Sequence, residues 1–96
     1  MSDASVQVRF GDGVSGHVVG FEGTMLTAVG ERAYAPGRPL ELTLCLPAGE
    51  AQVRGKALGS KRRDADGLFD VRIRLVDLRR EDRQRLLAAL AAGGAG

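Results

Sequence analysis

Apolar and polar residues alternate in six short runs of this 96-residue chain, and this alternation is the feature that most restricts its fold. In the clearest run, Leu40, Leu42, Leu44 and Leu46 are separated by polar residues or by cysteine. A period of two is typical of a strand with one buried face. The sequence therefore predicts six strands, at residues 6–10, 14–19, 24–29, 40–46, 51–58 and 69–75.

Turn signals separate these runs. The Gly-Asp-Gly segment at 11–13 favours a hairpin, the glycines of 20–23 should end the second strand, and 47–50 should form a further turn. Residues 30–39 are expected to form a loop, and 61–67 a polar hairpin loop. Because a lone small sheet would expose two edges, the strands predict an all-β fold, a closed or nearly closed antiparallel barrel.

The hydrophobic pattern changes after Asp77. Residues 81–92 contain no β-branched residue, and Leu86, Leu87 and Leu90 lie along one face of a helix drawn through them. The sequence therefore predicts one C-terminal helix, with Asp77 as its N-cap. So short a helix is marginal by itself, and we expect it to dock on the barrel.

A chain of this length supports one domain. We place the domain at residues 6–90, between a short tail at 1–5 and a flexible tail at 91–96. Cys45 is the only cysteine, so no internal disulfide can form, and its place in a strand predicts a buried thiol. The sequence shows no leader peptide and no apolar stretch of membrane-spanning length, which predicts a cytoplasmic protein without membrane insertion.

Charge is distributed unevenly, with a net charge of −3 over residues 1–53 and +5 over 54–96. Four cations occupy the outward positions of the last two predicted strands: Arg54, Lys56, Arg72 and Arg74. If these strands pair antiparallel, the four share one surface, which suits an acidic protein partner. At its end lies a candidate anion-binding loop of Lys61, Arg62 and Arg63. The alternative is a solvated face that serves solubility alone.

Two segments of the second half resemble the PilZ family. Residues 36–44 (PGRPLELTL) are similar to that family's PGxxLxLxL strand. Residues 70–78 (DVRIRLVDL), followed by a helix rich in acids and arginine, are similar to its last strand and helix. The resemblance covers residues 6–90 and implies a six-stranded PilZ-like barrel with one C-terminal helix, of a kind that typically binds cyclic di-GMP in bacteria.

The two segments that hold the nucleotide in the family are missing from this sequence. The family has an Arg-x-x-x-Arg segment ahead of its first strand, whereas residues 1–5 contain no arginine. Its Asp/Asn-x-Ser-x-x-Gly segment falls on Gly20, Glu22 and Met25, which removes an acceptor, adds a negative charge and adds bulk. Arg72 also stands where the family has a glycine. Guanidinium groups bind the phosphates of such a ligand through paired hydrogen bonds. Because the arginines that would supply them are missing, we expect no high-affinity cyclic di-GMP binding.

These features predict a single-domain PilZ-like adaptor or regulator. Family members without the motifs act through protein contacts in motility, pilus assembly or polarity control, and we expect the same here. One alternative is an unconventional cyclic di-GMP receptor that uses Arg9, Arg62 and Arg63. A second is a small barrel that binds RNA or single-stranded DNA, which the scarcity of aromatic residues disfavours.

His17 bears on whether the chain could be an enzyme or hold a cofactor. It is the only histidine, and no second ligand or triad partner is arranged around it. We therefore expect neither catalysis nor a metal or other cofactor. The sequence is also compatible with a homodimer.

Overall fold

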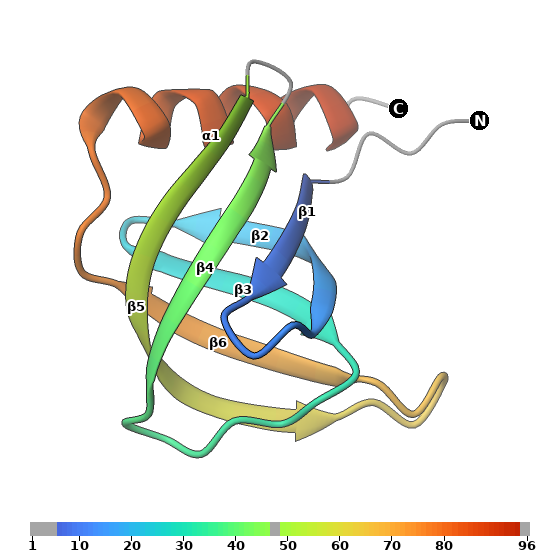
Figure 1. Cartoon of the computed structure of the whole chain (residues 1–96). Helices are drawn as coiled ribbons and strands as arrows, with labels where there is room; N and C mark the ends of the chain where they lie inside the picture. Colours follow the sequence, from blue (N-terminus) through green and yellow to red (C-terminus); the bar gives the residue numbers. More distant parts are fainter. Residues whose placement is uncertain (1–5, 47–48, 95–96) are drawn as a thin grey trace.

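The computed structural model describes residues 6–46 and 49–94, and there the chain forms a closed barrel of six antiparallel strands followed by one helix (Figure 1). The barrel order is β1-β2-β3-β6-β5-β4, and β1 pairs with β4 to close it. The elements are β1 (Val6–Phe10), β2 (Ser15–Glu22), β3 (Met25–Gly30), β4 (Pro39–Leu46), β5 (Gly49–Arg62), β6 (Phe69–Leu75) and α1 (Arg80–Gly94). The predicted all-β class, strand number and C-terminal helix are confirmed. The predicted tail at 1–5 and part of the predicted turn, 47–48, lie outside the described residues.

β5 is the longest strand and belongs to two pairs. Its first half pairs with β4 and its second half with β6. The predicted strand at 51–58 is too short at both ends, because polar residues continue the ladder where the apolar alternation stops. Lys61 and Arg62 consequently lie in β5, opposite Asp70 and Phe69, and the prediction that they belong to a hairpin loop is wrong.

β2 continues past its predicted end at Val19. Gly20 and Phe21 pair with Thr27 and Leu26 of β3, so the glycine continues the strand instead of ending it. The pairing register shifts at Val19, which is the extra residue of a β-bulge. The Val19 side chain is 51% exposed on the surface of the barrel.

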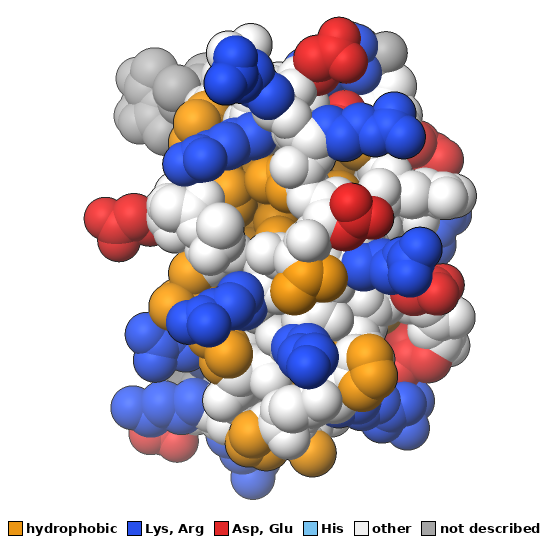
Figure 2. Space-filling model, turned by 90° about the vertical axis from the view of Figure 1, so that its left-hand side faces the viewer, with side chains coloured by type: hydrophobic (Ala, Val, Ile, Leu, Met, Phe, Trp, Pro, Cys, Tyr) orange, Lys and Arg blue, Asp and Glu red, His pale blue; other side chains and the backbone are white. Residues whose placement is uncertain are grey.

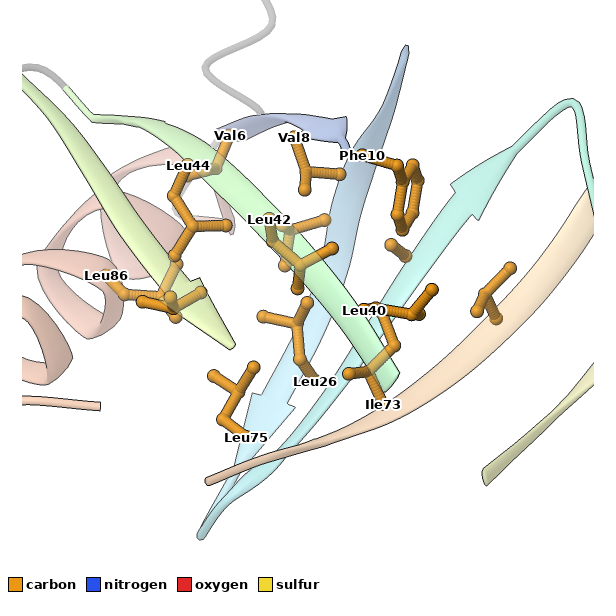
Figure 3. Packing of buried hydrophobic residues seen from close by; sticks show 14 of the residues in the cluster. Val6, Val8, Phe10, Leu26, Leu40, Leu42, Leu44, Ile73, Leu75 and Leu86 are labelled. Carbon is orange, nitrogen blue, oxygen red and sulfur yellow. The ribbon is translucent and has the colours of Figure 1, made fainter. Parts of the chain in front are cut away.

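The inward-facing side chains of the strands form one apolar core (Figure 3). Leu26, Leu44 and Ile73 come from three strands and have no exposed surface. Among the described residues, no charged side chain is buried. Cys45 is half-buried, so the prediction of a buried thiol is wrong. Its neighbours Leu44 and Leu46 face the core, and the alternation of the strand places Cys45 on the outside.

α1 packs against β1, β2 and β4 at one end of the barrel (Figure 1). Leu86 is fully buried and Ala89 is 7% exposed, whereas Leu87 is 43% exposed. The predicted buried face therefore includes Leu86 and the half-buried Leu90 but not Leu87. The reason is helical geometry, because consecutive residues point about 100° apart around the axis.

The ends of α1 differ from those expected. The first helical residue is Arg80, so Asp77 lies too early in the chain to be the N-cap. Glu81 and Asp82 in the first turn supply the negative charge that stabilises a helix N-terminus. At its other end α1 reaches Gly94, within the segment predicted to be flexible. Over residues 6–46 and 49–94, no helix has both the length and the apolar character needed to cross a bilayer.

Replacing Leu86 tests whether the core holds α1 in place. Leu86→Ala should lower the free energy of unfolding by about 2–5 kcal/mol, because it leaves a cavity between the helix and the strands. Leu87→Ala, on the exposed side of the same turn, should change it by less than about 0.5 kcal/mol. Urea denaturation followed by circular dichroism measures both values. Equal effects of the two substitutions would show that α1 is not anchored through Leu86.

Candidate functional site

The strands that carry the four predicted cations pair as expected. β5 and β6 are antiparallel, and Arg54, Lys56, Arg72 and Arg74 are all exposed on the outside of the barrel. These four residues are called the basic face below. Lys56 lies directly opposite Arg74, an arrangement of like charges that is mildly destabilising. Figure 2 shows the side of the molecule that carries β5, where Lys and Arg side chains are spread out with hydrophobic side chains between them.

A second bulge, on β5, sets the residue that lies opposite Arg72. The register of the β5–β6 pair shifts at Leu58, so Arg72 lies opposite Gly59. On its other side Arg72 is paired with Thr27 of β3. Leu58 itself is 39% exposed. Arg72 thus has no charged neighbour directly across either ladder, and the alternation of β5 places the apolar Leu58 side chain on the same outer surface.

The cations of the basic face are not neutralised within the described part of the chain. No carboxylate oxygen there lies within 4.0 Å of any of their nitrogen atoms. Elsewhere such pairs do form: Arg9 is 3.4 Å from Glu50, and Arg32 is 3.1 Å from Asp12. Glu41 is opposite Arg54 in the β4–β5 register but does not reach it. The cations of the basic face are therefore not held in ion pairs with the described carboxylates.

The three cations of the predicted anion-binding loop have different surroundings. Lys61 and Arg62 end β5, whereas Arg63 follows the strand. The Arg63 guanidinium is 3.5 Å from an Asp66 oxygen and 3.8 Å from an Asp70 oxygen, so its charge is compensated within the hairpin. Successive residues of a strand also point to opposite faces. The three side chains do not form one anion site.

Gly20, Glu22 and Met25, the positions that the resemblance assigns to a nucleotide motif, lie where β2 meets β3, beside the basic face. At Gly20 a β-carbon would meet open space. Glu22 is exposed and pairs with Met25, which is half-buried and pairs on its other side with Arg74. The row Glu22, Met25, Arg74 and Lys56 therefore crosses four neighbouring strands. An exposed carboxylate and a half-buried thioether therefore lie at one end of this row.

The arginines of the alternative nucleotide site are not brought together. Arg9 lies on β1, and β2, β3 and β6 separate it from Arg62 in one direction around the barrel. In the other direction, through β4, Arg9 aligns with Gln52 of β5, ten residues before Arg62. At about 3.3 Å per residue, this separation exceeds the reach of two side chains.

His17 occupies the outer side of β2. It is half-buried and lies opposite Gln7 and Val29, neither of which can act as a general base. Within the described ranges, no three His, Cys, Asp or Glu side chains gather closely enough to hold a metal ion.

The structure contains a site that sequence reasoning missed, a cleft of about 550 Å³ called the Tyr34 cleft below. Tyr34 is 3% exposed, and its hydroxyl donates to both oxygens of the Asp12 carboxylate, at 3.1 and 3.0 Å. Arg32 donates to the same carboxylate at 3.1 Å. The Tyr34 ring lies 5.0 Å from the Phe10 ring, between centroids, and 5.7 Å from the guanidinium carbon of Arg38.

The contact between Tyr34 and Asp12 changes the pKa of both groups. Burial, together with the hydrogen bond to Asp12 and its negative charge, raises the pKa of Tyr34 to about 12. Desolvation acts to raise the pKa of Asp12, but hydrogen bonds from the Val14 amide and the Tyr34 hydroxyl, with the charge of Arg32, outweigh it and lower that pKa. The sequence marks Tyr34 only as its sole tyrosine and Asp12 only as a turn residue.

Comparison with known proteins identifies no relative. No protein-family model, no curated protein and no solved structure matches this chain. What the chain binds must therefore be inferred from the basic face and the Tyr34 cleft.

Removing the Tyr34 hydroxyl tests its bond to Asp12. Tyr34→Phe should lower the free energy of unfolding by about 1.5–3 kcal/mol at pH 8, the usual range for a hydrogen bond to a charged group. The folded-state pKa of Tyr34, about 12, lies above its ordinary value of 10.0, so its contribution is complete below pH 10 and is lost as the pH rises towards 12. The stability difference between the native chain and the variant should therefore shrink across that interval. Urea denaturation at intervals from pH 8 to pH 12 measures it, and a constant difference would contradict the assignment.

Proposed function

We propose that this chain is a small PilZ-like adaptor that binds an acidic surface of a partner protein through the basic face, in the control of bacterial motility, pilus assembly or cell polarity. One observation carries the proposal: four exposed cations on two paired strands have no carboxylate within 4.0 Å among the described residues. Like charges across a ladder cost stability, and an acidic partner would offset that cost. Complementary charge also speeds and orients association.

The PilZ resemblance supports the regulatory part of this proposal. It implies a six-stranded barrel followed by one helix, and the element order of this chain fits that architecture. The resembling segments, residues 36–44 and 70–78, include the first residues of β4 and nearly all of β6. Because one barrel architecture can serve many functions, the family and its pathways are part of the proposal.

The surroundings of the lost motif favour a protein partner over a nucleotide. Glu22 is exposed where phosphates would lie, and Arg9 and Arg62 are too far apart to grip one ligand. None of the four aromatic side chains, all of which the structure describes, is exposed. Single-stranded nucleic acid normally stacks its bases on such side chains. A partner surface rich in Asp and Glu can bind exposed cations without paired arginines for a phosphate and without exposed aromatic rings for a base.

Calorimetric titration with cyclic di-GMP tests the exclusion of the nucleotide. We expect no measurable binding, because the arginine anchors are missing and Glu22 would repel phosphate. A dissociation constant in the low micromolar range or tighter, about 8 kcal/mol of binding free energy, would contradict this expectation. Titration with a single-stranded oligonucleotide in the same buffer should also show no specific binding.

Reversal of charge on β6 tests the basic face. Arg72→Glu combined with Arg74→Glu should abolish recovery of the native partner from a cytoplasmic extract. Both side chains are exposed, so each substitution should change the free energy of unfolding by no more than about 0.5 kcal/mol. Binding by the native chain should weaken with added salt, because exposed charges are screened over about 10 Å at 0.1 M ionic strength.

A matched control carries the same change of net charge on other elements. Arg9→Glu with Arg85→Glu alters β1 and α1, where both arginines already contact carboxylates. This control should retain the partner. Retention by the β6 double variant, with its fold confirmed by circular dichroism, would place the functional surface elsewhere on the barrel.

A further inference from the structure

The Tyr34 cleft adjoins the basic face and shares Arg54 and Lys56 with it. We propose that the cleft binds an acidic segment of the partner protein, with a carboxylate seated among Arg38, Arg54 and Lys56 and a neighbouring apolar side chain against Val76. This rests on the proposed function, because it takes the partner to be a protein. It adds the place and the chemistry of the contact.

Backbone hydrogen bonds hold the loop that carries Arg38 beside the cleft in the absence of any partner. Gly37 donates its amide to the Ala57 carbonyl at 2.7 Å, and Ala57 donates its amide to the Arg38 carbonyl at 2.9 Å. The Ser60 hydroxyl accepts from the Tyr34 amide at 2.8 Å and donates to the Tyr34 carbonyl at 3.0 Å. The loop between β3 and β4 is thus tied to β5 at two points. The Arg38 guanidinium carbon also lies 5.7 Å from the centre of the Tyr34 ring. A cation held over a ring and carried by a fixed backbone loses less conformational entropy when it binds an anion.

The cations of the cleft are available to a ligand, whereas one of its two lining carboxylates is already used. Arg38, Arg54 and Lys56 have no carboxylate within 4.0 Å among the described residues. Asp12 is bonded to the tyrosine hydroxyl and to an arginine outside the cleft lining. Glu41 is the other lining carboxylate. An excess of positive charge therefore faces any ligand that enters.

The cleft also offers an apolar contact. Val76 lines it and is 61% exposed, more than any other exposed large hydrophobic side chain among the described residues. Tyr34 and Leu40 also line the cleft, but they are 3% and 7% exposed and offer little surface for stacking. A nucleic-acid strand would meet cations here but no open aromatic ring. A segment that combines carboxylates with apolar side chains matches both features, and arginine binds carboxylates in a favourable forked geometry.

A capped, dye-labelled peptide of alternating Glu and Leu tests the cleft on the full chain, with a peptide in which Gln replaces Glu as its control. Fluorescence anisotropy should show the Glu peptide binding at least about tenfold more tightly, a difference of about 1.4 kcal/mol. Amide NMR signals of Gly11, Gly55 and Val76, which line the cleft, should shift on titration. Equal affinity for the two peptides, no binding of either, or shifts confined to other residues would overturn the proposal.

Two variants localise the binding. Arg38→Gln should weaken the Glu peptide about tenfold, the effect of losing one charged hydrogen-bond partner, whereas Arg9→Gln on β1 should leave it unchanged. Val76→Asp, at an exposed position, should weaken the peptide by repulsion whatever the state of Arg38. Unchanged affinity in both cleft variants would overturn the proposal. Oligothymidylate, added as a competitor, tests whether the cleft prefers nucleic acid. If it displaces the labelled peptide at a lower concentration than unlabelled Glu peptide does, the proposal is overturned in favour of a nucleic-acid ligand.

The native partner separates failure of the cleft from failure of the proposed function. Loss of the partner on Arg72→Glu with Arg74→Glu, but full retention on Arg38→Gln and on Val76→Asp, would overturn the cleft and leave the basic face standing. Retention by all of these variants would overturn both. Loss on the β6 reversal and on each cleft variant supports both.

Discussion

The pairing of β1 with β4 is the interaction on which the rest of this structure depends. It gives every strand of the barrel two hydrogen-bonded neighbours, so no strand edge within the described residues is left to pair with another chain. It also encloses the inward side chains on all sides, and α1 covers one end through Leu86. No charged side chain is buried among the described residues. All the charged side chains of the described part of the closed barrel and its helix therefore lie at the surface.

Close approach of the strands makes that closure possible and also positions the cations. A β-carbon at Gly55 would stand 2.6 Å from the Arg74 carbonyl oxygen and 2.8 Å from Cγ2 of Ile73, and one at Gly16 would collide with the Val29 carbonyl oxygen. β5 passes from β4 to β6 at Gly55, where it pairs with both strands. The two cations that flank this glycine therefore point outward at the junction, where the basic face and the Tyr34 cleft meet.

Much of this fold could be predicted from local sequence. The period-two alternation determined β1, β4 and β6 almost to the residue, because the direction in which each side chain of a strand points depends only on its position in that strand. For the same reason it determined that Arg72 and Arg74 lie outside the barrel. The antiparallel pairing of β5 with β6 followed from the short connection between them. The expectation that Gly20, Glu22 and Met25 do not hold a nucleotide comes from the resemblance of the sequence to the PilZ family and stays a prediction.

Only the tertiary structure decided which distant residues meet. The bulges at Val19 and Leu58 shift the registers of two strand pairs, and the second places Gly59 opposite Arg72. Asp12 and Tyr34 are 22 residues apart and carry no periodic signal, because each lies outside the regular strands. They come together when closure brings the β1–β2 turn against the loop before β4. A hydrogen bond between two such segments depends on the path of the whole chain, which no local pattern of residues encodes.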